Sequence, residues 1–198
     1  MRQATKPAKN TQQRRQFLRQ TLTAASVVGL GSFASNSFAS ALTAPIFDPD
    51  RQLKLVNTHT WEKLDIVYWS QGRYIPENLI KINHLMRDHR ANESTDMDVK
   101  LIDYLYNLYS LLESTERIHV LSGYRTKATN AKLRRRSNGV AKFSLHMEGR
   151  ALDISLPGRS AQKVRSAALS MEAGGVGYYG RSGFVHIDTG AVRNWSGS

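Results

Sequence analysis

The alternation of apolar and polar positions predicts three strands between residues 50 and 125. Residues 53–58 and 62–69 have a period of two, and Leu64, Ile66 and Tyr68 fall on one side of the second run. This period is typical of a strand with one buried face. A third run, residues 116–121, ends directly before a Ser-Gly-Tyr-Arg motif. We therefore expect these segments to pair in a sheet.

The spacing of apolar residues elsewhere predicts four helices. The first opens at Pro76, which suits the first helical position, and runs to about residue 90. The second begins near Asp96, whose carboxylate can cap it. The third spans residues 129–136 and ends at a Ser-Asn-Gly turn, while Ser160 caps the last. Together with the strands, these helices predict an α+β fold in which a small antiparallel sheet is flanked by helices.

Two later runs also alternate, and these carry acids and histidines. In residues 150–156, Asp153 lies on the face opposite to its apolar neighbours. In residues 184–188, His186 and Asp188 share the face opposite to the apolar residues. Each run therefore has an apolar face for a core and a polar face that presents ionisable side chains.

His146, Asp153 and His186 form a candidate set of metal ligands. Gly149, between the first two, permits a tight turn or a positive φ. Two imidazoles and a carboxylate are ligands that a catalytic zinc uses, and they leave a fourth position open. A single histidine–aspartate pair is more often a hydrogen-bonded pair at the surface. The prediction therefore depends on all three residues acting together.

Composition limits the class of protein. The chain has 198 residues, of which 40% are hydrophobic and 22% charged, which suits one compact domain with a tail. It contains no cysteine, which excludes disulfides, thiol catalysis and cysteine-bound zinc. Six of the 28 basic residues lie in the first 21 positions, and the remaining 22 exceed the 16 acids by six. This moderate excess suits an anionic cell-wall polymer as well as a nucleic acid, and we predict no nucleic-acid partner.

Residues 1–39 are predicted to be a twin-arginine export signal. Arg14 and Arg15 precede a weakly apolar segment, residues 22–34, which is too short to span a membrane. Small residues place cleavage after Ala39 or Ala41. We expect export by the twin-arginine machinery to the periplasm, a mature domain over residues 40–198, and no stable membrane insertion after processing. The alternative for the leader is a disordered basic arm.

Several motifs are distributed along the chain: the Arg14-Arg15 pair, Ser122-Gly-Tyr-Arg125, Asn138-Gly-Val-Ala-Lys142, Ser144-Leu-His-Met-Glu-Gly-Arg-Ala-Leu-Asp153, Ala173-Gly-Gly-Val-Gly-Tyr-Tyr179 and Phe184-Val-His-Ile-Asp188. These motifs resemble those of the zinc D-alanyl-D-alanine carboxypeptidase-like peptidases, which share a fold with the hedgehog amino-terminal domain. Within that group, nearly the whole chain resembles the murein endopeptidase K family, a periplasmic branch. The resemblance implies that His146, Asp153 and His186 bind zinc, that Arg125 contacts the substrate, and that the substrate is a peptidoglycan stem peptide.

The general base is where the chain departs from its relatives. Several related enzymes carry Glu or Asp three residues before the last ligand, or His two residues before it, whereas this chain has Gly183 and Phe184 there. Asp188 lies about 6.5 Å along the strand from His186, so it either acts as the base or supports His186. Glu148 is a weaker candidate for the base, because it lies in a turn.

Arg125 is the candidate for substrate contact. Its planar guanidinium can bind a carboxylate at two points or stabilise an oxyanion. The alternative is an ordinary surface ion pair.

The sequence therefore predicts an exported zinc metallopeptidase that hydrolyses the cross-links between stem peptides during cell-wall remodelling. One alternative is a D,D- or L,D-carboxypeptidase that trims the same peptides. Another is a metal-containing module that binds the wall without catalysis.

Overall fold

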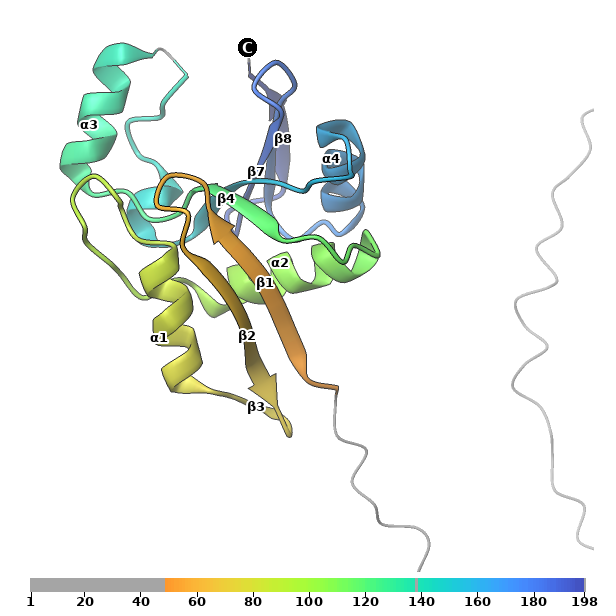
Figure 1. Cartoon of the computed structure of the whole chain (residues 1–198). Coiled ribbons are helices and arrows are strands. Elements are labelled where there is room, and N and C mark those ends of the chain that lie inside the picture. Colours follow the sequence, from red (N-terminus) through yellow and green to blue (C-terminus); the bar gives the residue numbers. More distant parts are fainter. Residues whose placement is uncertain (1–48, 138, 198) are drawn as a thin grey trace, which may run out of the picture. The chain divides into compact units, whose positions relative to one another are not determined.

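The computed structural model describes residues 49–137 and 139–197 and has one open β-sheet with helices packed against it (Figure 1). The predicted leader over residues 1–39 and its boundary with the mature domain lie outside the described residues. The eight described strands are β1 (Arg51–Asn57), β2 (Lys63–Ser70), β3 (Arg73–Tyr74), β4 (Ile118–Ser122), β5 (Ala151–Ser155), β6 (Gly175–Tyr179), β7 (Phe184–Asp188) and β8 (Arg193–Ser196). The described helices are α1 (Pro76–Leu85), α2 (Val99–Leu111), α3 (Lys127–Arg136) and α4 (Ala161–Ser170), together with the 3-10 turn η1 (Leu145–Glu148).

The strands are ordered β3-β2-β1-β4-β5-β7-β6-β8 across the sheet. Most neighbours are antiparallel, but β1 pairs with β4 and β6 pairs with β8 in parallel. The predicted α+β class is confirmed. The sheet is larger than expected and mixed, because the chain returns through helices before β4 and through a loop before β8.

The two faces of the sheet have different roles. One face is covered by α1, α2 and α4, and side chains from these helices form a single core with the apolar residues of the strands. The hydroxyl of Tyr104 on α2 donates to the carbonyl of Ala168 on α4 at 3.0 Å, which ties these two helices together. The opposite face carries Asp153, His186 and Asp188, the candidate site residues that belong to strands.

Tertiary contacts shift three of the predicted helix boundaries. The first helix ends at Leu85 instead of residue 90, because the carbonyl of Met86 accepts the amide of Tyr124 at 2.8 Å. The second is capped by Asp98, whereas Asp96 accepts a hydrogen bond from Asn83. The third begins at Lys127, two residues earlier than predicted, with Thr126 as its cap. The predicted Ser160 cap of α4 is confirmed.

Three strands, β3, β6 and β8, were not predicted. The glycine-rich run over residues 173–179 contains β6, in which Val176 and Tyr178 contribute to the core face while glycines occupy the polar face. β8 is a short edge strand without an apolar period. None of the described helices is long and apolar enough to cross a membrane.

Candidate metal centre

The pairing of β5 with β7 brings two candidate ligands together. Asp153 pairs directly with His186 in an antiparallel register, so both side chains project from the same face. The apolar residues between them, including Leu152 and Ile187, are fully buried on the other face. The predicted alternation of both runs is confirmed.

The turn η1 supplies the third candidate ligand. His146 lies in this turn, and its backbone carbonyl accepts the amide of Arg125 at 3.1 Å. The turn ends at Gly149, whose φ of 68° is the left-handed conformation that glycine favours. A Cβ at this position would also collide with the backbone of Asp96. The expected role of Gly149 is confirmed, and it directs the chain from His146 into β5.

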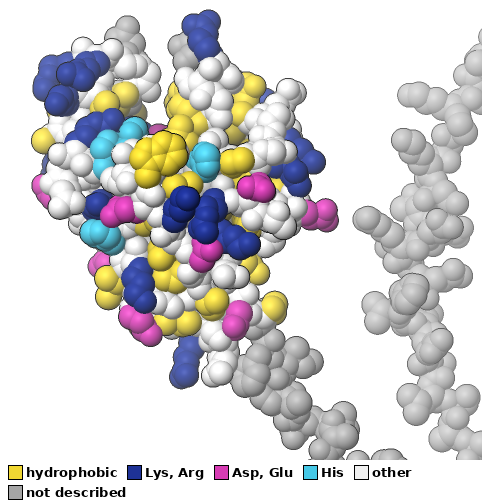
Figure 2. All heavy atoms as spheres, in the orientation of Figure 1, with side chains coloured by type: hydrophobic (Ala, Val, Ile, Leu, Met, Phe, Trp, Pro, Cys, Tyr) yellow, Lys and Arg dark blue, Asp and Glu magenta, His cyan; other side chains and the backbone are white. Residues whose placement is uncertain are grey.

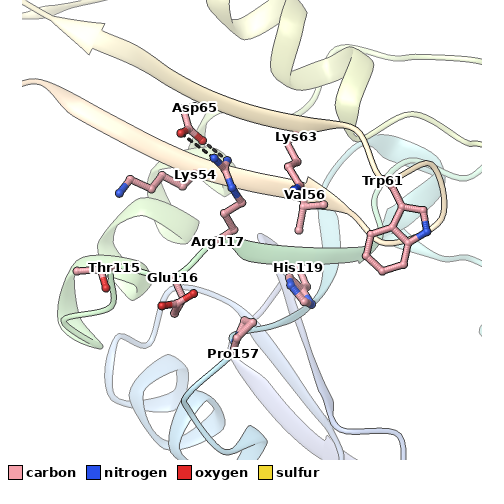
Figure 3. A pocket seen from close by; sticks show the side chains of 10 residues that line it. All are labelled: Lys54, Val56, Trp61, Lys63, Asp65, Thr115, Glu116, Arg117, His119 and Pro157. Carbon is pink, nitrogen blue, oxygen red and sulfur yellow. Dashed lines mark hydrogen bonds and ion pairs between the residues drawn. The ribbon is translucent and has the colours of Figure 1, made fainter.

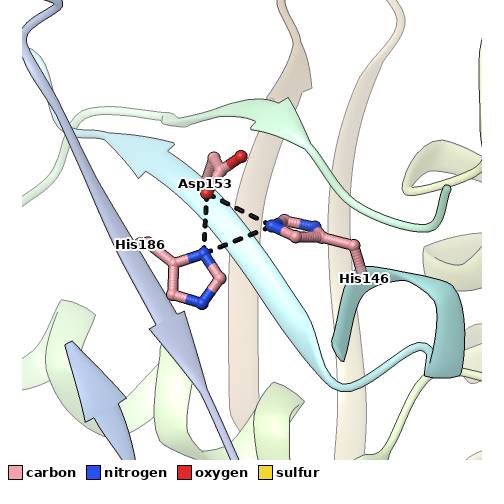
Figure 4. A group of neighbouring side chains, drawn as sticks. All are labelled: His146, Asp153 and His186. Atoms are coloured by element: carbon pink, nitrogen blue, oxygen red, sulfur yellow. Dashed lines mark hydrogen bonds and ion pairs between the residues drawn. The ribbon is translucent and has the colours of Figure 1, made fainter. Parts of the chain in front are cut away.

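Three acceptor atoms converge in front of these strands (Figure 4). Nδ1 of His186 lies 2.9 Å from Oδ1 of Asp153 and 3.2 Å from Nε2 of His146. The third side of the triangle, from Nε2 of His146 to Oδ1 of Asp153, is 3.3 Å. A tetrahedral ion with bonds of about 2.0–2.1 Å separates its ligand atoms by about 3.3 Å. The side chains are therefore spaced as three corners of a zinc-sized tetrahedron.

Hydrogen bonds on the outer side of each imidazole select the nitrogen that faces the cluster. Nδ1 of His146 donates to the carbonyl of Gly123 at 2.7 Å, because a carbonyl can only accept. Nε2 of His186 donates in the same way to Oδ2 of Asp188 at 2.9 Å. The lone pairs of His146 Nε2 and His186 Nδ1 therefore point at the same region as the carboxylate of Asp153. A cluster of acceptors of this kind suits a cation.

Burial and neighbouring charges set the ionisation of the three residues. Burial lowers the pKa of His146, and Arg125 adds to this effect. Burial disfavours the carboxylate of Asp153, but the two histidines and Arg125 outweigh it and hold its pKa well below the usual range. For His186, burial is outweighed by its bonds to Asp153 and Asp188, which raise its pKa. A neutral His146 and an ionised Asp153 are the states that metal coordination requires.

Arg125 borders the cluster. Its Nε donates to the hydroxyl of Ser122 at 2.8 Å, and its Nη2 donates to Oδ2 of Asp153 at 2.5 Å. Nη2 is also 3.3 Å from Nε2 of His146. Within the described part of the chain, Nη1 has no partner. Nε and Nη2 therefore hold Arg125 in place, and Nη1 remains able to donate a hydrogen bond to another group.

A buried aspartate supports the loop that carries Arg125. Both the amide and the hydroxyl of Thr126 donate to Oδ2 of Asp88 at 2.9 Å. Burial alone would raise the pKa of Asp88, but hydrogen bonds from Thr129, Thr126 and the amide of Arg90 outweigh it and lower the pKa. Asp88 is only 2% exposed, so this carboxylate forms part of the interior frame of the site.

Asp188 lies behind His186 and is fully buried. Its Oδ1 accepts the amides of Gly175 and Gly190 at 3.1 and 2.8 Å and Nη1 of Arg193 at 2.9 Å. Its Oδ2 accepts Nη2 of Arg193 at 2.7 Å and Nε2 of His186 at 2.9 Å. Because five donors occupy its two oxygens, this geometry favours the supporting role over that of a base.

The sequence did not indicate two further residues at the site, both on β8. Arg193 forms an ion pair with Asp188, and the ring centroids of Trp195 and His186 are 5.1 Å apart. Both need glycines on the neighbouring strand: a Cβ at Gly175 would meet the guanidinium of Arg193, and one at Gly177 would meet the indole of Trp195. These glycines therefore leave room for two side chains beside the site.

Glu148 projects away from the cluster. Its side chain is 54% exposed and pairs with Arg150 at 3.1 Å. Gly183 and Phe184, which precede His186 by three and two residues, offer no ionisable group. Two of the remaining histidines, His59 and His89, stack on each other with ring centroids 4.0 Å apart.

Comparisons with known proteins agree with these motifs. A family model described as "Peptidoglycan L,D-endopeptidase MepK" matches residues 47–195. A relative of that name from Escherichia coli (strain K12) is 49% identical over 145 residues, which cover 73% of this chain and 80% of the relative. A "Probable peptidoglycan L,D-endopeptidase MepK" from Haemophilus influenzae is 40% identical over 172 residues, which cover 86% of this chain and 91% of the relative. The range matched by the family model contains every candidate site residue described above.

Proposed function

The chain belongs to the peptidoglycan L,D-endopeptidase MepK family, and from this premise we propose that it is an exported zinc peptidase that cuts peptide cross-links in peptidoglycan. The names of its relatives specify internal cleavage at a bond between an L- and a D-configured residue, and we assign the same bond to this chain. The predicted leader supports export by the twin-arginine route and action in the periplasm.

The observation that carries the proposal is the triangle formed by His146, Asp153 and His186. Its sides of 3.2, 2.9 and 3.3 Å match the spacing of ligands around zinc, and the outer hydrogen bonds leave a lone pair on each imidazole facing inward. Two imidazoles and one carboxylate are a donor set that zinc uses in hydrolases. When bound, zinc polarises a peptide carbonyl and makes water more acidic.

The chain's own residues bind and orient the substrate around this centre. Arg125 presents its unpartnered Nη1 beside the cluster, where it can donate to a carboxylate of the substrate or to the oxygen of the scissile carbonyl. Asp188 keeps His186 in the tautomer whose Nδ1 faces the cluster. Arg193 and two backbone amides in turn fix Asp188, so that the imidazole does not rotate.

The surface beside the centre supports an anionic polymer as the substrate. Residues 118–147 contain no acid, and Figure 2 shows Lys and Arg side chains gathered over α3. None of these side chains has an ion-pair partner within the described residues. A cationic surface raises the local concentration of a polyanion and speeds its encounter with the site. The exposed cations of α3 are Lys127, Lys132, Arg134, Arg135 and Arg136.

Digestion of intact sacculi by the purified protein tests this function and its alternatives together. An endopeptidase converts cross-linked fragments into un-cross-linked ones without loss of a terminal residue. Release of only a terminal amino acid would indicate the carboxypeptidase, and wall binding without any release would indicate the non-catalytic module. His186→Ala provides the control, because it removes a candidate ligand and is expected to release nothing.

A further inference from the structure

A hollow of about 420 Å³ lies on the face of the sheet opposite to α1, α2 and α4, apart from the triangle of candidate ligands (Figure 3). It is bordered by β1, β2 and β4 and by the loops that precede β4 and follow β5. Figure 3 shows Trp61 at one end and Lys54 toward the other. The side chains that line it include Lys54, Val56, Trp61, Lys63, His119 and Pro157.

The charges in the hollow leave two lysines without partners. Arg117 forms a two-pronged ion pair with Asp65, so these two charges compensate each other. Within the described residues, neither Lys54 nor Lys63 has a hydrogen-bond or ion-pair partner. Glu116 adds one negative charge at the rim, and the lining as a whole keeps a positive excess. The hollow therefore favours an anionic group.

The apolar part of the lining suits a ligand that also has an aliphatic portion. The indole of Trp61 is 68% exposed, which is unusual for so large an apolar ring, and Val56 is 3% exposed. Pro157 faces them across the hollow (Figure 3). His119 also lines the space, and its ring has no partner among the described residues. This mixture of an aromatic ring, apolar contacts and fixed cations is typical of a binding site for a small ligand or peptide segment.

The register of the sheet connects the hollow with the metal centre. His119 on β4 pairs with Ser155 on β5, and Ser155 is two residues from Asp153 on the same face. With about 4.8 Å between strands and about 3.3 Å per residue along them, His119 and Asp153 are separated by about 8 Å. Lys63 pairs with Val56, which pairs with His119, so Lys63 lies two strands beyond His119 and about 16 Å from Asp153. Lys54, two residues from Val56 along β1, lies at a similar distance. An extended peptide advances about 3.3–3.6 Å per residue, so a segment of about five residues reaches from Asp153 to the two lysines.

We propose that this hollow is a second substrate subsite, which binds a carboxylate-bearing arm of the cross-linked peptide about five residues from the bond that is cut. The carboxylate lies between Lys54 and Lys63, and the aliphatic part of the arm packs on Trp61. This proposal rests on the proposed function, because it names the part of the same substrate that lies beyond the metal centre. It explains why two unpaired lysines and an exposed indole border one hollow on the face that carries the site.

A kinetic comparison of long and short substrates tests the subsite. The double variant Lys54→Gln/Lys63→Gln is expected to lower kcat/KM on a full cross-linked dimer about fivefold, mostly through KM. Its activity on a peptide truncated at the residues flanking the scissile bond should not change. Lys100→Gln/Lys163→Gln removes the same charge from exposed positions on α2 and α4 and should behave as wild type on both substrates. Equal losses on both substrates, or no loss on the dimer, would overturn the proposal.

A binding measurement separates failure of the subsite from failure of the proposed function. Calorimetry on metal-depleted protein with an un-cross-linked stem peptide needs no turnover. We expect about fivefold weaker binding for the lysine double variant and for Trp61→Ala, with Ile80→Ala as the matched exposed control. A peptide with amidated carboxylates should bind the wild-type protein as weakly as the unmodified peptide binds the double variant. If inorganic phosphate binds the hollow as tightly as the peptide, or if amidation changes nothing, the carboxylate-peptide subsite is wrong, whether or not the protein cleaves peptidoglycan.

Discussion

Replacing Asp188 with Asn distinguishes the two roles that the sequence left open for this residue. The substitution keeps the size of the side chain but provides one acceptor oxygen and an NH2 group in place of two acceptor oxygens. In the native protein, Oδ1 accepts three donors and Oδ2 accepts two. Whichever way the amide is oriented, its NH2 faces at least two donors. At least two hydrogen bonds are therefore lost.

The structure indicates how large this effect should be. If the NH2 takes the place of Oδ2, His186 loses the acceptor that keeps its proton on Nε2. The imidazole then rotates or moves its proton to Nδ1, the atom that faces the metal, and zinc affinity falls about 10–100-fold. Two lost hydrogen bonds to charged groups cost about 1.5–3 kcal/mol each, and less where Arg193, whose side chain is 44% exposed, can turn to water. We expect the free energy of unfolding to fall by about 2–4 kcal/mol.

Zinc affinity and turnover should be measured separately for this variant. A chromophoric chelator in competition gives the dissociation constant for zinc, and cleavage of a cross-linked dimer at saturating zinc gives turnover. A supporting residue predicts weaker zinc binding with turnover partly restored by excess metal. Tight zinc binding with turnover abolished would refute this reasoning and identify Asp188 as the base. Asp103→Asn is the matched control, because Asp103 accepts from Arg51, Tyr68 and Tyr74 and belongs to α2.

Three further predictions concern the leader, the substrate arginine and the interior frame. Replacing Arg14 and Arg15 with Lys should leave precursor in the cytoplasm, as measured by fractionation; normal export would exclude the twin-arginine route. Arg125→Lys should weaken transition-state binding by about 1.5–3 kcal/mol, measured from kcat/KM, with zinc content unchanged. Wild-type kinetics in this variant would indicate that Arg125 forms only an ordinary ion pair. The carboxylate of Asp88 has a lowered pKa in the folded protein. Its contribution to the free energy of unfolding is therefore complete above the unfolded pKa of about 3.9 and is lost as pH falls through the lower, folded pKa. Thermal unfolding of Asp88→Asn and wild type should therefore differ most above pH 4 and converge in stronger acid, and a constant difference would contradict the ionised state.

The strands that carry the candidate ligands could be predicted because their pattern is local. A period of two in residues 150–156 and 184–188 requires one face to be apolar, which determines the side on which Asp153 and His186 project. The direct pairing of these two residues could not be read from the sequence, since register depends on contacts between segments about thirty residues apart. The resemblance to a known family implied only that the two residues share a metal with His146.

Helix ends and edge strands were less predictable because tertiary contacts decide them. The apolar spacing continues past Leu85, but the carbonyl of Met86 bonds to the amide of Tyr124 instead of extending the helix. A glycine-rich run has low strand propensity, so β6 was not expected. Its glycines are accommodated because Arg193 and Trp195 occupy the space that side chains would need. These two residues on β8 had no local signal, although one fixes Asp188 and the other lies against His186.

The zinc content of the His186→Ala protein tests the central claim most directly. His146, Asp153 and His186 come from η1, β5 and β7, and only the fold brings them together. The chain buries a large core elsewhere, so the variant should keep its secondary structure by circular dichroism. We expect about one zinc per chain in the wild-type protein and almost none in the variant after dialysis against a weak chelator. One zinc per chain retained by folded His186→Ala would contradict the three-ligand centre.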